Sequence, residues 1–295
     1  MALLQHRLQQ FIYLNYLILE IMSIFKFIES FTNDDLMQSK SSRRDTFGQF
    51  GKLGKNLALA SIPFGMSAFT NKAFASDIGP TPSTPIGALQ LALTLEYLEK
   101  EYYQMGLDLG VIPTGGRDEK VFMQISAHET DHVSFLIAGL GGTGSPNFVV
   151  KPTFDFTVGG LFSPFTDYQQ FLALAQAFED TGVRAYKGQA GNLISTPDLL
   201  TAALQIHSVE ARHASEVRRL RGQKGWIVGN NRGGLPAQAQ GVYDGEENIM
   251  QAGFNAGTVN NGSSGPVIPS GAGSESFDEP LTTQQVVSIA NLFIV

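Results

Sequence analysis

The sequence predicts an all-α fold, a four-helix bundle with one long crossover connection, followed by an irregular glycine-rich extension. Three observations support this fold class. Four segments place apolar residues at helical spacing, the second pair of segments repeats the pattern of the first, and a long Gly- and Pro-rich connection separates the two pairs. The chain has 295 residues, of which 43% are hydrophobic, which is enough for a large core.

The first helix is predicted to begin at Thr84 and Pro85, because threonine caps a helix N-terminus and proline suits the first helical position. It is expected to run to Gly106. The other three helices are predicted over residues 118–138, 167–187 and 197–221. Short connections make the helices of each pair antiparallel neighbours. Residues 139–165 are long enough to cross the length of the bundle between the pairs.

Each predicted helix carries a glutamate within its apolar stripe. The first and third helices share a Glu-x6-Tyr pattern, and the second and fourth share Glu-x-x-His. The two copies of one pattern lie almost as far apart along the chain as the two copies of the other, which indicates an internal duplication. The residues of these patterns are Glu96 and Tyr103, Glu129 and His132, Glu179 and Tyr186, and Glu210 and His213.

Four glutamates facing one core need a counter-charge, because a buried carboxylate must be paired, protonated or coordinated. The nearby cations Lys100, Arg184 and Arg212 lie off the stripes. A glutamate and a histidine three residues apart on a helix differ by about 60° around the axis and about 4.5 Å along it, so both can reach one metal ion. Four carboxylates and two imidazoles are enough ligands for two divalent ions, so the pattern predicts a dinuclear metal site.

At these residues the chain resembles ferritin-like domain proteins, of the group that includes desiccation-related proteins. The resemblance covers residues 84–221 and extends to the segments "YDGEEN" and "FDEPLT" near the C-terminus. It implies two metal ions, with iron favoured and manganese as the alternative. It also implies six ligands: the terminal carboxylates Glu96 and Glu179, the bridging carboxylates Glu129 and Glu210, and one histidine for each ion, His132 and His213.

The resemblance further implies that Tyr103 and Tyr186 are hydroxyl groups that orient the ligand carboxylates. The third helix departs from the first where Gly182 stands opposite Glu99. Glu99 is therefore expected to be a spare ligand that makes the two metal positions unequal.

Simpler interpretations exist for the single features. One Glu-x-x-His pattern alone is typical of a solvated helix face, but two matched copies make coincidence a poor explanation. His128 and His207 lie off the stripe or at its edge, so they are expected to support ligands or cap a helix rather than bind metal. Tyr102 and Tyr103 also fit ordinary packing in a bundle.

The N-terminal region, residues 1–75, is predicted to be an export signal. It holds eight Lys and Arg against five Asp and Glu, whereas the rest of the chain holds twelve against twenty-two. Adjacent Arg43 and Arg44, an apolar run over residues 56–69 and the small residues Ala73 and Ala75 resemble a twin-arginine signal and its cleavage site. Met22 is an alternative start of translation. A buried N-terminal helix is the alternative to an export signal, and the general secretion route is the alternative to the twin-arginine route.

The remaining chain divides into the bundle, residues 76–225, and the extension, residues 226–295. The extension lacks a helical period and is rich in Gly, Asn, Ser and Gln, so part of it is predicted to be disordered. A short apolar helix after Pro280 and Thr282 is expected to pack back on the bundle.

Composition excludes several classes of function. Without cysteine the chain cannot hold thiolate zinc, an iron–sulfur cluster or a disulfide, and a net charge of −7 argues against a nucleic-acid surface. No apolar segment is expected to form a stable membrane span. The expected partners are a small-molecule oxidant or a metal ion. The sequence does not decide whether the chain forms an oligomer.

Two functions fit these predictions. The first is an exported, periplasmic or extracellular protein that uses the dinuclear non-haem site for redox chemistry with iron, oxygen or peroxide. As an enzyme it would be a di-iron ferroxidase-like or di-manganese catalase-like oxidoreductase. The second is a non-catalytic stress or desiccation-related structural protein on the same bundle. Storage of iron in a closed cage fits less well, because the crossover and the extension would sit awkwardly on a shell.

Overall fold

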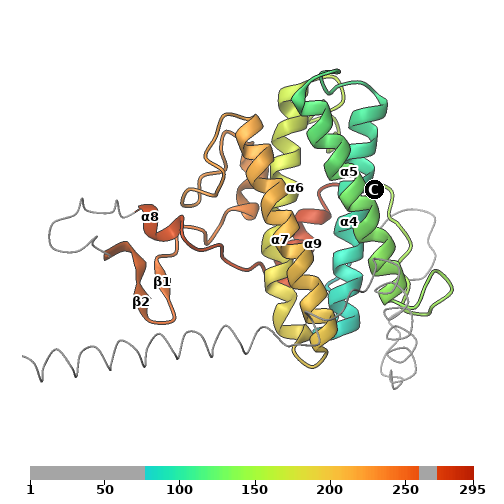
Figure 1. The fold of residues 1–295 in the computed structure, drawn as a ribbon, viewed down its shortest axis with the longest axis vertical. Coiled ribbons are helices and arrows are strands. Elements are labelled where there is room, and N and C mark those ends of the chain that lie inside the picture. The colour runs from blue at the N-terminus through green and yellow to red at the C-terminus, as the bar shows by residue number, and fades with distance from the viewer. Residues whose placement is uncertain (1–76, 259–270) are drawn as a thin grey trace, which may run out of the picture. The chain divides into compact units, whose positions relative to one another are not determined.

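Four long helices form an antiparallel bundle in the computed structural model, which describes residues 77–258 and 271–295 (Figure 1). They are α4 (Pro85–Asp108), α5 (Arg117–Gly139), α6 (Tyr168–Gln189) and α7 (Pro197–Leu220). The predicted fold class is confirmed, and each predicted helix begins and ends close to the observed one. The export signal predicted for residues 1–75 lies outside the described residues.

Local sequence explains where the bundle helices begin. The Thr84 side chain accepts a hydrogen bond from the Gly87 N–H at the start of α4, and Asp167 caps α6 in the same way. α7 begins with Pro197. α5 follows Gly116, which offers no side-chain cap, but two acidic residues in its first turn favour the positive end of the helix dipole.

The connection between α5 and α6 crosses the length of the bundle, as predicted. Near the start of α4, Gln90 donates a hydrogen bond to the Asn147 carbonyl. Further along α4, Lys151 pairs with Glu101, and near its end the Phe156 ring packs on Tyr102. α5 and α6 therefore run in the same direction, and α4 and α7 run in the opposite one (Figure 1).

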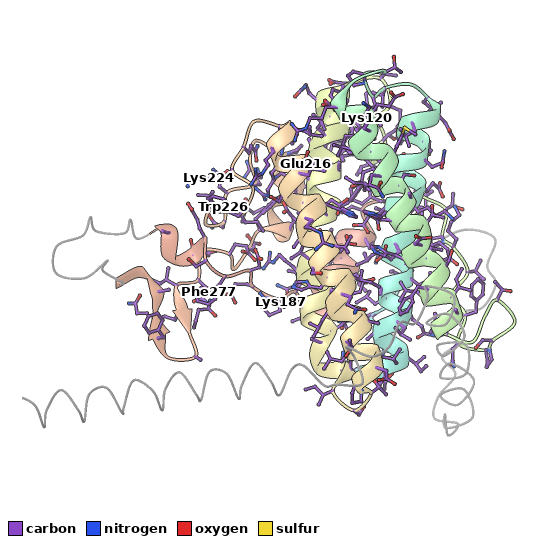
Figure 2. All side chains as sticks on the ribbon, viewed as in Figure 1. Lys120, Lys187, Glu216, Lys224, Trp226 and Phe277 are labelled. Atoms are coloured by element: carbon purple, nitrogen blue, oxygen red, sulfur yellow. The ribbon has the colours of Figure 1, made fainter. Side chains whose placement is uncertain are left out.

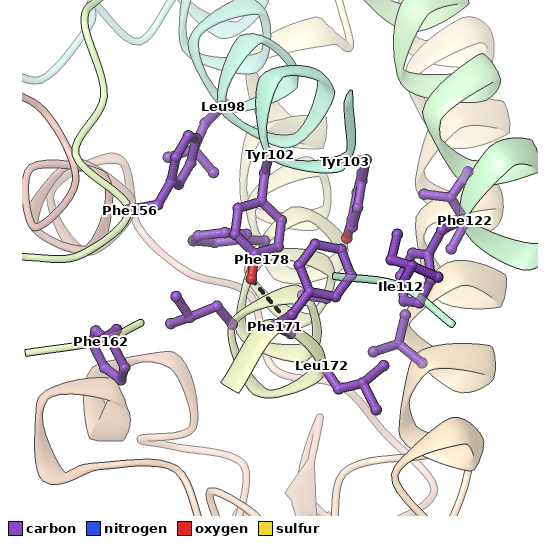
Figure 3. Close-up of a cluster of buried hydrophobic side chains, with 14 of the residues drawn as sticks. Leu98, Tyr102, Tyr103, Ile112, Phe122, Phe156, Phe162, Phe171, Leu172 and Phe178 are labelled. Carbon is purple, nitrogen blue, oxygen red and sulfur yellow. Dashed lines mark hydrogen bonds between the residues drawn. The ribbon is translucent and has the colours of Figure 1, made fainter. Parts of the chain in front are cut away.

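The bundle interior contains two apolar clusters, on opposite sides of the central glutamates. We call the cluster around Tyr102, Phe122 and Phe171 the aromatic half of the bundle; Figure 3 shows its stacked and edge-on rings. The cluster at the other end, where α4 and α7 begin, is built mainly from leucine and alanine, and we call it the aliphatic half. The two clusters together fix the spacing of the four helices at the central layer.

The C-terminal extension packs against α4 and α6 through its last helix, α9 (Thr283–Ala290), as expected. Thr282 and Gln285 form a capping box at its start. Before α9 come the short helical segments η2 (Ala237–Val242), η3 (Ala256–Thr258) and α8 (Gly271–Ser274). An antiparallel pair, β1 (Met250–Gln251) and β2 (Phe254–Asn255), was not predicted, because such short strands are too brief to show a strand period.

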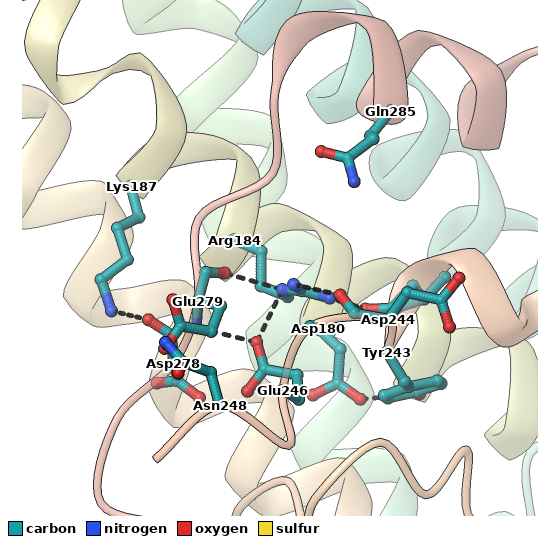
Figure 4. A network of polar contacts seen from close by, with 12 residues as sticks. Asp180, Arg184, Lys187, Tyr243, Asp244, Glu246, Asn248, Asp278, Glu279 and Gln285 are labelled. Carbon is teal, nitrogen blue, oxygen red and sulfur yellow. Dashed lines mark hydrogen bonds and ion pairs between the residues drawn. The ribbon is translucent and has the colours of Figure 1, made fainter. Parts of the chain in front are cut away.

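A buried arginine on α6 attaches the extension to the bundle (Figure 4). Arg184 is 1% exposed, pairs with Glu246 and donates to the backbone carbonyls of three residues of the extension, Val242, Asp244 and Glu279. These partners lie in or beside the "YDGEEN" and "FDEPLT" segments. The Arg184 side chain therefore binds the extension and not the central glutamates, which agrees with its predicted place off the glutamate stripe.

A second buried ion pair supports the same side of the bundle. Arg218 of α7 binds the Asp180 carboxylate of α6, which also accepts a 2.8 Å hydrogen bond from the Tyr243 hydroxyl. Nearer the surface, Lys224 and Trp226 both donate to Glu275 (Figure 2 labels Lys224 and Trp226).

Among the described residues, no helix is long and apolar enough to cross a membrane.

Candidate metal centre

All six residues predicted to bind metal meet in the middle of the bundle. Their side chains form two groups whose candidate ligand atoms all lie within 4.8 Å of one another. Every member is 9% exposed or less, and each of the four helices contributes. One group is Glu96, Glu129, His132 and Glu210; the other is Glu129, Glu179, Glu210 and His213.

Each histidine lies at the centre of one group. His132 Nδ1 is 2.9 Å from a Glu129 oxygen, 3.1 Å from Glu96 and 3.2 Å from Glu210. His213 Nδ1 is 2.9 Å from the other Glu129 oxygen and 3.3 Å from Glu179. The Glu-x-x-His spacing has the effect predicted for it, since the two side chains of one helix point at one place.

Several ligand atoms are buried without any hydrogen-bond partner. They are one oxygen of Glu129, one of Glu179, both oxygens of Glu210, and Nδ1 of His213. Nδ1 of His213 and the nearest Glu129 oxygen lie close together, yet they are not aligned for a hydrogen bond. A buried polar atom left unpaired in this way costs about 1–3 kcal/mol of stability. Within each group these ligand atoms lie close to one another.

Among residues 77–258 and 271–295, the ion pairs made by Lys and Arg all go to other acidic residues. Within this part of the chain, the ion-pair partners of the central carboxylates are therefore the two histidines, His132 and His213. Carboxylate oxygens and imidazole nitrogens are the ligands that iron, manganese and zinc accept. The donor set and its unpaired atoms thus fit divalent cations.

Burial and mutual repulsion shift the pKa values of the central carboxyl groups. Burial raises the pKa of Glu129 to about 7, although the neighbouring imidazoles of His132 and His213 act against it. Burial and the neighbouring Glu129 hold the pKa of Glu210 well above its usual range. For Glu96, burial is outweighed by the charge and hydrogen bond of His132, which bring the pKa below its ordinary value.

The histidine pKa values move upward. Burial alone would lower the pKa of His213, but Glu179 and Glu129 raise it to about 11. The pKa of His132 is raised in the same way, chiefly by Glu96 acting against burial. Without a bound cation the cluster is therefore neutralised by protons, and cations that bind there must displace those protons.

Two tyrosines fix the outer carboxylates. Tyr103 of α4 donates a 2.5 Å hydrogen bond to Glu179 of α6, and Tyr186 of α6 donates to Glu96 of α4. Each tyrosine thus reaches across to the helix that repeats its own. The two hydroxyl groups contact the carboxylates to which the family resemblance assigned the terminal positions.

A chain of side chains backs His213 on the side away from the carboxylates. Its Nε2 is 2.9 Å from Nδ1 of His128, and the other ring nitrogen of His128 is 2.7 Å from the Gln124 amide. This agrees with the supporting role expected for His128, whereas Gln124 was not predicted. Its position one helical turn before His128 on α5 is the signal that could have identified it.

Glu99 is buried beside the centre but belongs to neither ligand group. A Cβ atom at Gly182 would lie 3.1 Å from a Glu210 oxygen and 3.3 Å from a Glu99 oxygen. The glycine therefore leaves room for two carboxyl groups side by side. Burial and repulsion, first by Glu210, raise the pKa of Glu99 well above its usual range.

His207 and Tyr102 lie away from the ligand atoms. His207 is half-buried on α7, and its Nδ1 atom has no hydrogen-bond partner. The Tyr102 hydroxyl donates to the Phe171 carbonyl, and its ring belongs to the aromatic half. Tyr102 is thus a packing residue, in contrast to its neighbour Tyr103.

Comparison with known families agrees with this geometry. Residues 84–223, which contain the whole bundle and all six convergent residues, match the family model for the ferritin-like domain. No curated protein matches the chain. The matched region, the four helices and the buried acidic and histidine cluster together identify residues 84–223 as a ferritin-like domain.

Proposed function

We propose that this protein holds two divalent metal ions, iron or manganese, and uses them for redox chemistry with iron, oxygen or peroxide. The observation that carries the proposal is that Glu129 and Glu210 belong to both ligand groups. A carboxylate shared by two groups can bridge two cations. Each group then adds one histidine and one further carboxylate, which gives two complete and similar metal positions.

Two ferrous ions held by these six residues would supply the two electrons that, with two protons, reduce dioxygen to hydrogen peroxide. The residues of the chain supply what surrounds that chemistry. Burial excludes bulk water from the ligand atoms. Tyr103 and Tyr186 hold Glu179 and Glu96 in position. Glu99 lies buried beside the centre as one further carboxyl group.

Metal content and thermal melts with and without a chelator test the site. The wild type should bind iron or manganese and melt at a lower temperature after chelation, because a ligand present at 100 times its Kd stabilises the folded state by about 2.7 kcal/mol. His213→Ala should bind less metal and lose less stability on chelation. His207→Ala is the matched control: it removes a half-buried histidine of the same helix that belongs to neither group, and its chelator shift should equal that of the wild type.

A wild type without any chelator shift would overturn the dinuclear site, as would equal shifts in the wild type and His213→Ala. Either result would leave a non-catalytic structural protein on the same bundle. If metal binds but neither ferrous oxidation nor peroxide breakdown exceeds the rate of the free ion, the redox part of the proposal fails while the site stands.

The proposal includes export to the periplasm or the cell exterior. Its support is the basic N-terminal region with Arg43 and Arg44, followed by an acidic remainder of the chain. N-terminal sequencing of protein from its native host should find a mature chain that begins near Ser76. A cytoplasmic chain that retains both arginines would contradict export.

A further inference from the structure

An apolar cavity occupies the aliphatic half of the bundle and ends beside the metal centre. All four bundle helices line it, and Tyr186, the residue that binds Glu96, forms part of its wall. Its space exceeds what one water molecule needs. Almost every other lining residue is leucine, isoleucine, alanine or phenylalanine. A cavity with such walls stays dry and takes up apolar molecules.

The duplication explains where this space comes from. Three alanines of the cavity wall occupy the positions that match three rings of the aromatic half in the other repeat. The separation along the chain within each match is the one that relates the glutamates of the same two helices. The matched positions are Ala88 with Phe171, Ala185 with Tyr102, and Ala203 with Phe122. The rings that close one half (Figure 3) are thus replaced by methyl groups in the other.

The few polar groups in the cavity wall already have partners. The Tyr186 hydroxyl donates to Glu96. The Gln189 amide nitrogen donates to Thr283, and its oxygen accepts from Asn192. A polar guest would therefore lose its hydrogen bonds to water and find no free donor or acceptor, at a cost of roughly 2–7 kcal/mol per group. An apolar guest has no such cost.

We propose that this cavity binds dioxygen next to the metal centre, so that dioxygen rather than hydrogen peroxide is the oxidant that reaches the centre from the aliphatic half. The inference rests on the proposed redox function for the identity of its guest. Dioxygen is small and apolar, whereas hydrogen peroxide and a hydrated metal ion both require polar partners. Tyr186 lines the cavity and its hydroxyl binds Glu96, so a guest there lies on the side of the His132 group.

Xenon binding to the metal-free protein tests the cavity independently of any activity. Xenon occupies dry apolar cavities, so 129Xe NMR or xenon-pressurised crystals should show one saturable site in the aliphatic half. Ala203→Phe, which restores the ring found at Phe122, should abolish it. Ala203→Leu is the milder variant if the phenylalanine does not fit. Leu204→Phe adds a ring to the exposed side of the same turn and should leave xenon binding unchanged.

Oxidation rates of the metal-loaded protein test the guest. With Ala203→Phe or Ala203→Leu the dioxygen-driven rate should fall about tenfold, the change that a loss of ~1.4 kcal/mol of binding produces. The peroxide-driven rate and the Leu204→Phe control should not change. Absence of a xenon site would overturn the cavity, and an unchanged dioxygen rate despite blocked xenon binding would overturn its role. A protein that binds xenon but no metal would instead refute the proposed function and with it the assignment of dioxygen.

Discussion

The two halves of the bundle are built from repeated helices, yet their interiors differ. In the aromatic half Tyr102 stacks on Phe171 with ring centroids 4.8 Å apart, and Phe122 meets Phe171 edge-on at 5.0 Å. In the aliphatic half alanines stand at the matching positions and leave a cavity. The six candidate ligands and the two tyrosines that bind them match in both repeats, whereas Glu99 corresponds to Gly182. The packing around the ligand layer can therefore differ while the ligands stay the same. Metal ligands must be particular residue types, whereas core residues need only be apolar and fill the available volume.

A void also changes what a leucine contributes to stability. Leu172 and Leu89 hold equivalent places in the two repeats, separated along the chain as Glu179 is from Glu96, and both are buried. Leu172 is packed into the aromatic half, whereas Leu89 lines the cavity, so part of its side chain faces empty space. Because Leu172 and Leu89 are the same residue type at equivalent helix positions, a difference between them in their contribution to stability comes from packing.

The largest expected effect is on this pair. Leu172→Ala should lower the free energy of unfolding by about 4–5 kcal/mol and Leu89→Ala by about 2–3 kcal/mol, the two ends of the range for buried leucines. Urea titration of the metal-free variants measures both. Equal losses would mean that the two halves are packed alike, and the comparison would no longer hold.

The carboxylate layer that joins the halves gives the next effect, on pH dependence. The pKa of Glu129 is raised to about 7 and that of His213 to about 11, so the folded state holds protons that the unfolded state has released. Stability is then greatest below the unfolded pKa values and falls as the pH rises through the folded ones. The metal-free protein should therefore lose stability between pH 5 and about pH 8, of the order of 2 kcal/mol for each of the two groups.

Thermal melts of the metal-free protein across this range measure the trend. Loading with metal should reverse it, since cations compete with protons for the same atoms and bind better at higher pH. If the metal-free protein became more stable as the pH rose, protons would not be what neutralises the layer.

The helices and ligands were predictable because their signals are local. Thr84 and Pro85 mark a helix start within a few residues, and Glu-x-x-His places two side chains on one helix face whatever surrounds it. The repeat then showed which faces meet. The supporting role of His128 followed from its place at the edge of the stripe, but its contact with His213 depends on how α5 packs against α7.

The cavity and the contacts that Arg184 makes with the extension were not predicted, since both depend on how several segments of the chain pack together. Three small residues leave a void only if no neighbouring side chain fills the space, which a pattern along one helix does not reveal. Arg184 binds backbone carbonyls of a segment without any helical period, and carbonyls carry no sequence signal. The alanines that take the place of rings between the two repeats were nevertheless visible in the sequence.

The smallest expected effect concerns the two tyrosines, which make the same contact in different surroundings. Tyr103→Phe leaves Glu179 without its hydrogen bond in the closely packed aromatic half, where a hydrogen bond to a charged group is worth about 1.5–3 kcal/mol. Tyr186→Phe frees a Glu96 oxygen beside the otherwise apolar cavity, so a water molecule can take the place of the lost hydroxyl and bind that oxygen. Tyr103→Phe should therefore cost about 1 kcal/mol more than Tyr186→Phe in urea titrations of the metal-free protein. The contrast should vanish when Ala203→Phe is added, because the restored ring leaves no place for that water, and a contrast that persists would show that the cavity does not reach Glu96.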